Sequence, residues 1–159
     1  MEEDLSMKKK DLMQICEKYC AKLRISPFWD VKLQFVEDAS WPKTGDIKID
    51  CDDRKAILLL NFINPKQENL EEVIVHELMH LKMYPLDQVT EGLITSCFEE
   101  GTAAQRFAYH EFFTALEQTV EELAKCFLLE FGDDRELSFG RCGCQKSFNE
   151  LYDGLSNLD

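Results

Sequence analysis

The order of hydrophobic and polar positions along the chain predicts a helix followed by three strands. Apolar side chains in residues 12–23 recur at helical spacing, and "SPF" ends this helix because proline disfavours helical geometry in the residue before it. Residues 30–38 and 45–50 alternate between apolar and polar side chains, as half-buried strands do. The apolar run "KAILLLNFI" suits a strand buried on both faces. We expect a small sheet, of three strands or slightly more, covered by the helix.

A second helix is predicted from Asn69 to about Tyr84. Asn69 is a suitable N-cap, and Glu72 three residues later completes the pattern of a capping box. Pro85 is expected to end this helix. Residues 85–100 show no clear periodicity, although a short helix could form there.

A long helix is predicted from about Ala103 to Phe131, with Gly132 as its C-cap. This order of helices and strands predicts an α+β fold. We assign residues 1–131 to one compact domain and residues 132–159 to a polar C-terminal tail.

Composition and charge restrict the function classes. The formal net charge of −13 argues against binding to nucleic-acid phosphates or to an acidic membrane surface. No apolar run approaches the roughly 20 residues of a spanning helix, and the N-terminal residues lack the features of a signal peptide. We therefore expect a cytoplasmic location and no nucleic-acid or membrane partner, while the oligomeric state stays open.

The seven cysteines do not have the pattern of a disulfide framework. They are odd in number and include no C-x-x-C pair, so a zinc ribbon finds no support either. Cys16 and Cys20 lie on one helical face, and we expect them to be small core residues.

The candidate chemistry lies in "VIVHELMHL", residues 73–81. On a helix His76 and His80 point the same way and can bind one metal ion, for which Zn²⁺ is suitable. Glu77 lies about 100° around the helix, where it can accept a proton from metal-activated water without being a ligand. The alternative is a chance arrangement, but burying three ionisable groups in an apolar helix is costly unless they bind something.

Catalytic zinc usually has three protein ligands, and no third histidine follows His80 closely. On the last helix Glu117 falls about 60° from Val120, the centre of the apolar stripe, and Glu121 falls about 100° away. Glu117 is therefore the acid expected to face inward, with Glu121 placed to orient a ligand. Three polar residues are expected to point to the opposite side of this helix: Glu111, Gln118 and Glu122.

Other assignments on the last helix stay open. Glu117 could instead be a solvated residue at the border of the stripe. His110 could be a rival ligand, a hydrogen-bond donor to the transition state or a substrate contact, and Tyr109 is a weaker candidate for the donor role.

These residues resemble the gluzincin class of zinc metallopeptidases, and within it the small single-domain minigluzincins. Those families pair an HEXXH helix with a glutamate ligand on a downstream helix, and the resemblance covers most of residues 10–130. It implies a zincin-like fold, with His76, His80 and Glu117 as zinc ligands and Glu77 as general base and acid. We therefore expect a zinc-dependent peptidase-type hydrolase with a peptide or protein substrate.

Minigluzincins also include latent forms in which the chain's own end occupies the cleft. In the tail, "RCG" at residues 141–143 resembles the core of the cysteine-switch motif of secreted matrix metalloproteinase propeptides. A thiolate of Cys142 or Cys144 can fill the open position of a zinc ion. The alternatives are a tail that blocks the cleft without a zinc–sulfur bond and a flexible tail with unreactive thiols.

Two further functions are compatible with the motif. One is a latent or non-catalytic zinc-binding interaction module with a closed metal site. The other is an SprT-like protease that acts on DNA-bound proteins, although the acidic balance and the missing zinc ribbon count against it.

Overall fold

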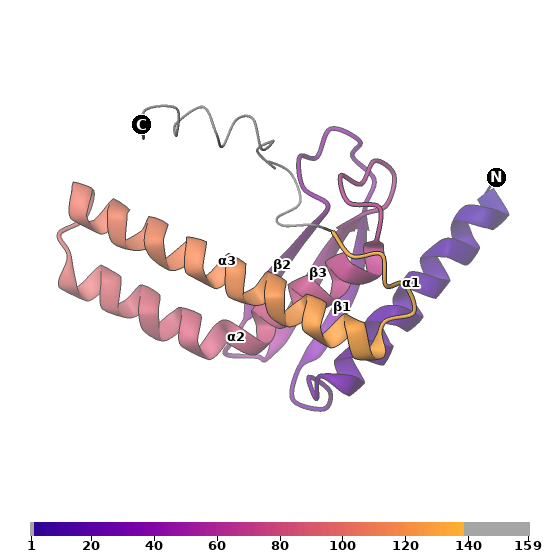
Figure 1. Cartoon of the computed structure of the whole chain (residues 1–159), viewed down its shortest axis with the longest axis horizontal. Helices are drawn as coiled ribbons and strands as arrows, with labels where there is room; N and C mark the ends of the chain where they lie inside the picture. Colours follow the sequence, from indigo (N-terminus) through magenta and orange to yellow (C-terminus); the bar gives the residue numbers. More distant parts are fainter. Residues whose placement is uncertain (1, 139–159) are drawn as a thin grey trace, which may run out of the picture.

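The computed structural model describes residues 2–138 and has an α+β fold (Figure 1). Its elements, in chain order, are α1 (Glu2–Lys22), β1 (Asp30–Val36), β2 (Gly45–Asp50), β3 (Lys55–Asn61), α2 (Leu70–Cys97) and α3 (Ala103–Phe131). The predicted order of helices and strands is confirmed at this level. None of the helices in the described part of the chain is long and apolar enough to cross a membrane.

The three strands form one mixed sheet in the order β1-β3-β2. β1 is parallel to the central strand β3, and β2 is antiparallel to it, with Leu58 of β3 opposite Leu33 of β1 and Ile47 of β2. β2 is therefore an edge strand of the three-stranded sheet, next to α2.

One face of the sheet carries the core. Ala56, Leu58 and Leu60 of β3 are buried, and they share the core with α1, α2 and α3. Ile57, on the other face, is 39% exposed, so the prediction that this strand is buried on both faces was wrong. Among residues 2–138 the helices pack on the face that carries Ala56, Leu58 and Leu60, and the continuous apolar run could not reveal this.

Helix α2 begins where expected but continues far beyond the predicted end. Asn69 is its N-cap, with a side chain that accepts a hydrogen bond from the backbone N–H of Glu72. Pro85 lies inside the helix, so the prediction that it ends there was wrong. Proline removes one helical hydrogen bond and crowds the preceding turn, but packing of α2 against α3 offsets that cost.

Helix α3 has the predicted bounds, and Gly132 is its C-cap. Leu116, Val120 and Ala124 are buried against α2, which confirms the centre of the apolar stripe. Not every apolar residue at helical spacing from Val120 is buried, because α3 packs mainly on α2. Three of them are more than a third exposed: Phe113, Leu123 and Phe131. The three polar residues expected on the opposite side are exposed: Glu111, Gln118 and Glu122.

The chain that follows α3 returns to the first turn of α2. Buried Glu71 accepts hydrogen bonds from the backbone N–H groups of Asp133 and Asp134, and buried Glu72 accepts two from Ser138. The first residues that we assigned to the tail are thus attached to the helix that carries "HELMH". Cys16 and Cys20 are both buried in α1, as expected.

Candidate metal centre

Helix α2 brings His76 and His80 together on one face. The buried side chains of Ile74, Val75 and Leu78 fix the rotation of this helix against the core. The Nε2 atoms of the two histidines are 3.2 Å apart, as expected for residues one helical turn apart.

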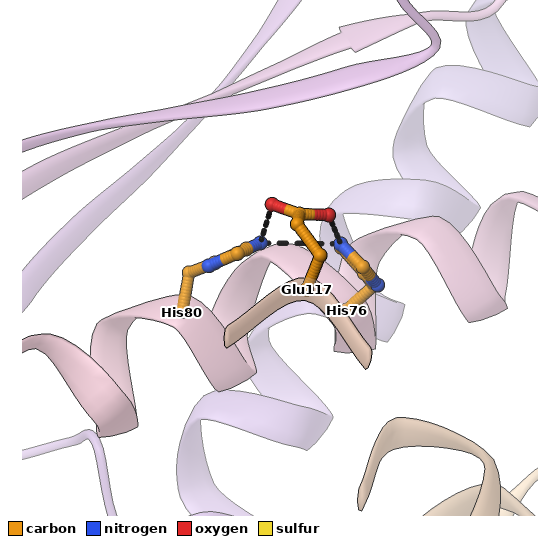
Figure 2. A group of neighbouring side chains, drawn as sticks. All are labelled: His76, His80 and Glu117. Carbon is orange, nitrogen blue, oxygen red and sulfur yellow. Dashed lines mark hydrogen bonds and ion pairs between the residues drawn. The ribbon is translucent and has the colours of Figure 1, made fainter. Parts of the chain in front are cut away.

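Glu117 reaches the same point from α3 (Figure 2). Its Oε1 atom lies 3.3 Å from Nε2 of His80, and its Oε2 atom lies 3.7 Å from Nε2 of His76. One ligand atom from each of the three side chains lies within 4.8 Å of the others, so the group could hold a metal ion. Sequence periodicity placed Glu117 at the flank of the stripe, and the packing of α3 on α2 turns that flank toward the histidines.

Glu121 lies behind His76, one turn after Glu117. Its Oε2 atom is 3.0 Å from Nδ1 of His76, and its Oε1 atom is 3.0 Å from Nζ of Lys125. This contact orients the imidazole and leaves Nε2 facing Glu117, the arrangement in which a carboxylate orients a metal-binding histidine. The structure therefore places Glu121 where the sequence predicted an orienting residue.

The contact between His76 and Glu121 favours the charged form of each group. Burial lowers the pKa of His76, but the hydrogen bond to Glu121 and the nearby carboxylates outweigh burial, so the pKa is raised. Burial of Glu121 raises its pKa, but the hydrogen bonds from His76 and Lys125 bring it down to about 2. Glu121 therefore remains an ionised hydrogen-bond acceptor at neutral pH.

Glu77 is next to the cluster but is not part of it. Its side chain is only 9% exposed, and burial raises its pKa although the neighbouring His76 and His80 act in the opposite direction. Gly45, at the start of β2, approaches it closely, since a Cβ atom at Gly45 would lie 2.8 Å from Oε1 of Glu77. A carboxylate with a raised pKa beside a possible metal site is suited to accept and return a proton.

A cavity of about 890 Å³ is lined by the candidate ligands together with Glu77, Glu121 and Gly45. Residues of β2 line one side of it, and residues of α2 and α3 line the other, including His76, His80, Glu77 and Glu117. The candidate metal ligands therefore line a cavity rather than the closed core.

The other candidates from the sequence lie elsewhere or outside the described residues. His110 is exposed on α3 and does not line the cavity. The hydroxyl of Tyr109 is 3.0 Å from that of Thr95, its ring stacks on Phe113, and Tyr109 does not line the cavity. Cys142 and Cys144 lie outside the described residues.

Sequence reasoning missed four residues of this region: Gly45, Asp87, Glu91 and Lys125. Lys125 follows Glu121 by four residues, a spacing that favours an ion pair on a helix and could have been noticed. No local signal marks Gly45, because its neighbour Glu77 is distant in the sequence. Asp87 and Glu91 were missed because Pro85 was expected to end the helix.

In comparisons with protein-family models, with curated proteins and with solved structures, nothing matched this chain. Any functional interpretation therefore depends on the chemistry of the candidate metal centre and its cavity.

Proposed function

We propose that this chain is a zinc-dependent peptidase of the gluzincin type, with a zincin-like fold. The observation that carries the proposal is the convergence of His76, His80 and Glu117 in a cavity where Glu77 lies beside them. Two imidazoles and one carboxylate are a ligand set found in catalytic zinc sites, and three protein ligands leave one position open for chemistry.

The spacing of the three side chains supports zinc. Two ligand atoms at 2.0–2.1 Å from zinc and at the tetrahedral angle are about 3.3 Å apart. The Nε2 atoms of His76 and His80 are 3.2 Å apart, and Oε1 of Glu117 is 3.3 Å from Nε2 of His80. Both distances are close to this value, and the other carboxylate oxygen of Glu117 lies 3.7 Å from Nε2 of His76.

A zinc ion held by these ligands would supply Lewis-acid chemistry, polarising a peptide carbonyl and acidifying water. Glu77 would accept the proton of the attacking water and deliver it to the leaving amine, since it lines the same cavity as the candidate ligands. Glu121, supported by Lys125, would hold His76 with Nε2 facing the ion.

Zinc content tests the ligand assignment. After dialysis against a weak chelator, we expect about one zinc per chain in the wild type, bound by the His-His-Glu group found among residues 2–138. Glu117→Ala should lose the metal, whereas His110→Ala should keep it because His110 lies away from the cluster. No zinc in the wild type after remetallation would end the proposal.

Substitution of Glu77 tests the peptidase assignment separately. The Glu77→Gln variant should retain zinc, because Glu77 is not in the ligand group, but lose most peptide hydrolysis. Removal of a general base typically costs a factor of about 10²–10⁴ in rate. Unchanged hydrolysis by the zinc-loaded variant would contradict the assigned role.

The alternative function is a zinc module whose open position is closed by the chain itself. One observation favours it: Ser138 contacts both Glu72 and Glu121, which line the cavity, and Cys142 is only four residues further along the chain. Four extended residues span up to about 14 Å. Cobalt-substituted protein should show a thiolate-to-metal absorption band that Cys142→Ser or Cys144→Ser removes; a wild-type spectrum without this band would exclude a thiolate ligand.

A further inference from the structure

The cavity extends along α2 beyond the candidate metal centre. His76, His80, Tyr84, Asp87 and Glu91 all line it, and they follow one another in steps of four, four, three and four residues. Such steps keep side chains on one face of a helix. The row is continuous because α2 passes through Pro85 without ending.

Asp87 and Glu91 form no ion pair with a lysine or arginine among residues 2–138. The amide of Gln88 donates a hydrogen bond of 3.2 Å to Glu91, but this group is neutral. By contrast, Asp46 on the β2 side of the cavity is paired with Lys43 at 3.2 Å and with Lys48 at 2.8 Å. The part of the cavity beyond His80 therefore carries negative charge that the described chain does not neutralise.

Asp87 also has an unsatisfied atom. Its Oδ1 is buried and has no hydrogen-bond partner within the described part of the chain. Burial raises the pKa of Asp87 and the nearby carboxylate of Glu91 raises it further, while His80 acts in the opposite direction. A buried acceptor without a donor costs free energy that a ligand can recover by supplying one, most effectively from a positively charged group.

Helix geometry gives the distance of this acidic pair from the metal ligands. Asp87 is seven residues after His80 and Glu91 is eleven, so they lie about 10 and 16 Å along the helix from it. An extended peptide advances about 3.3 Å per residue. An α-amine adjacent to the cleaved bond would be too close to the metal to reach the pair, whereas a long basic side chain a few residues away can do so.

We propose that Asp87 and Glu91 form a subsite for the side chain of an arginine or lysine within about three residues of the cleaved peptide bond. The guanidinium group of arginine suits it best, because several donors in one plane can satisfy two carboxylates together. This inference rests on the proposed peptidase function and adds a substrate class to it.

Cleavage of matched peptides tests the subsite. Two N-acetylated peptide pools would be compared, one with arginine and the other with citrulline at the same position, and neither with other charged residues. Citrulline has nearly the same shape as arginine but carries no charge. For the zinc-loaded full chain we expect kcat/KM to be about tenfold higher with arginine, as hydrogen bonds between charged groups are the stronger ones. Asp87→Asn combined with Glu91→Gln should bring this ratio close to one.

The control variant combines Glu111→Gln with Glu122→Gln, which changes the net charge of the chain by the same amount as the double substitution of Asp87 and Glu91. Glu111 and Glu122 are exposed on α3 and do not line the cavity, so this variant should keep the arginine preference. Equal cleavage of both pools by the wild type would overturn the subsite and leave the peptidase function standing. An arginine preference that survives in the double variant would overturn the assignment to Asp87 and Glu91.

Binding separates this inference from the peptidase proposal. The Glu77→Gln variant, loaded with zinc, would be titrated with both pools in a calorimeter. Tighter binding of the arginine pool, lost on substitution of Asp87 and Glu91, would support the subsite even if the wild type cleaved no peptide. Equal affinity for the two pools would overturn the subsite. It would also be overturned if citrulline peptides with a free N-terminus bound more tightly than acetylated ones, because Asp87 and Glu91 would then bind an α-amine.

Discussion

At the scale of single residues, Gly45 shows how a backbone contact sets the position of a functional group. A Cβ atom there would lie 2.6 Å from Cγ1 of Val73 and 2.8 Å from Oε1 of Glu77. Both distances are too short for a methyl group. A residue with a side chain at this position would therefore have to displace the start of β2, the side chain of Val73 or the carboxylate of Glu77. Gly45 therefore lets the edge of the sheet lie directly over Glu77.

The Gly45→Ala variant should lose peptidase activity at least about tenfold, because a shift of 1 Å in a catalytic group can cost far more than that. We also expect the free energy of unfolding to fall by about 1–3 kcal/mol, as is typical for overpacking. Urea unfolding and initial rates with zinc-saturated protein measure the two effects.

Gly92→Ala is the matched control for this experiment. Gly92 is in helix α2, and a Cβ atom there would meet nothing within 4 Å. Alanine should leave activity unchanged and stabilise the helix by up to about 1 kcal/mol. If Gly45→Ala behaved like the control, close contact between β2 and Glu77 would not be needed for catalysis.

At the scale of elements, the decisive feature is the length of α2. Its first part carries the two histidines, and the part beyond Pro85 carries Asp87 and Glu91 into the same cavity. Buried Ile94 packs this second part against α3. The local preference of proline was outweighed by packing between two helices, which no short window of sequence contains.

Pro85→Ala should stabilise the protein by about 1–2 kcal/mol, because alanine restores the missing N–H group and is the better helix former. The stabilisation is reduced because the unfolded chain gains conformational freedom when proline is replaced. Urea unfolding measures the change, with Pro65→Ala as the control. Pro65 lies outside the helices and strands, so its substitution should give no comparable gain. A Pro85→Ala protein no more stable than the wild type would argue against a helix that is continuous through this position.

At the scale of the whole molecule, Tyr19 joins parts of the chain that are far apart in sequence. Its hydroxyl donates a hydrogen bond to Glu71 of α2 and also lies 3.1 Å from the backbone carbonyl oxygen of Phe131 at the end of α3. Glu71 in turn binds the backbone of the segment after α3. One buried network thus connects α1, α2 and the chain that leads to the tail.

Tyr19→Phe should lower the free energy of unfolding by about 1–2 kcal/mol at neutral pH, because Glu71 loses a buried hydrogen-bond donor. Tyr109→Phe is the control, since that hydroxyl contacts Thr95 and is not part of this network. A loss no larger for Tyr19 than for Tyr109 would show that the network adds little to stability.

Tyr19→Phe should also change how the stability of the protein depends on pH in the alkaline range. Burial, followed by the hydrogen bond to Glu71, raises the pKa of Tyr19 above its ordinary value of about 10. Above that pH the unfolded chain loses the proton while the folded chain keeps it, so wild-type stability falls as pH rises. The fall between pH 10 and 12 should be shallower in Tyr19→Phe. Equal slopes in urea unfolding at these pH values would contradict the raised pKa.

Much of the site could be predicted because its residues are related by helical geometry. The step from His76 to His80 places both imidazoles on one face of any helix, and the stripe around Val120 made Glu117 the best inward-facing acid. The prediction of a strand buried on both faces failed because the number of layers in the fold is not encoded in one strand. Asp87 and Glu91 could not be placed once Pro85 was taken as a helix end.

The sequence by itself determined the kind and order of the elements, the spacing of the histidines and the caps at Asn69 and Gly132. These features depend on contacts between residues close in the chain, where covalent geometry leaves few choices. Only the tertiary structure decided that Glu117 meets the histidines, that Gly45 lies against Glu77 and that the cavity continues past Pro85. Each of these depends on how α2 packs against α3 and β2, because burial of apolar surface between distant segments sets those distances.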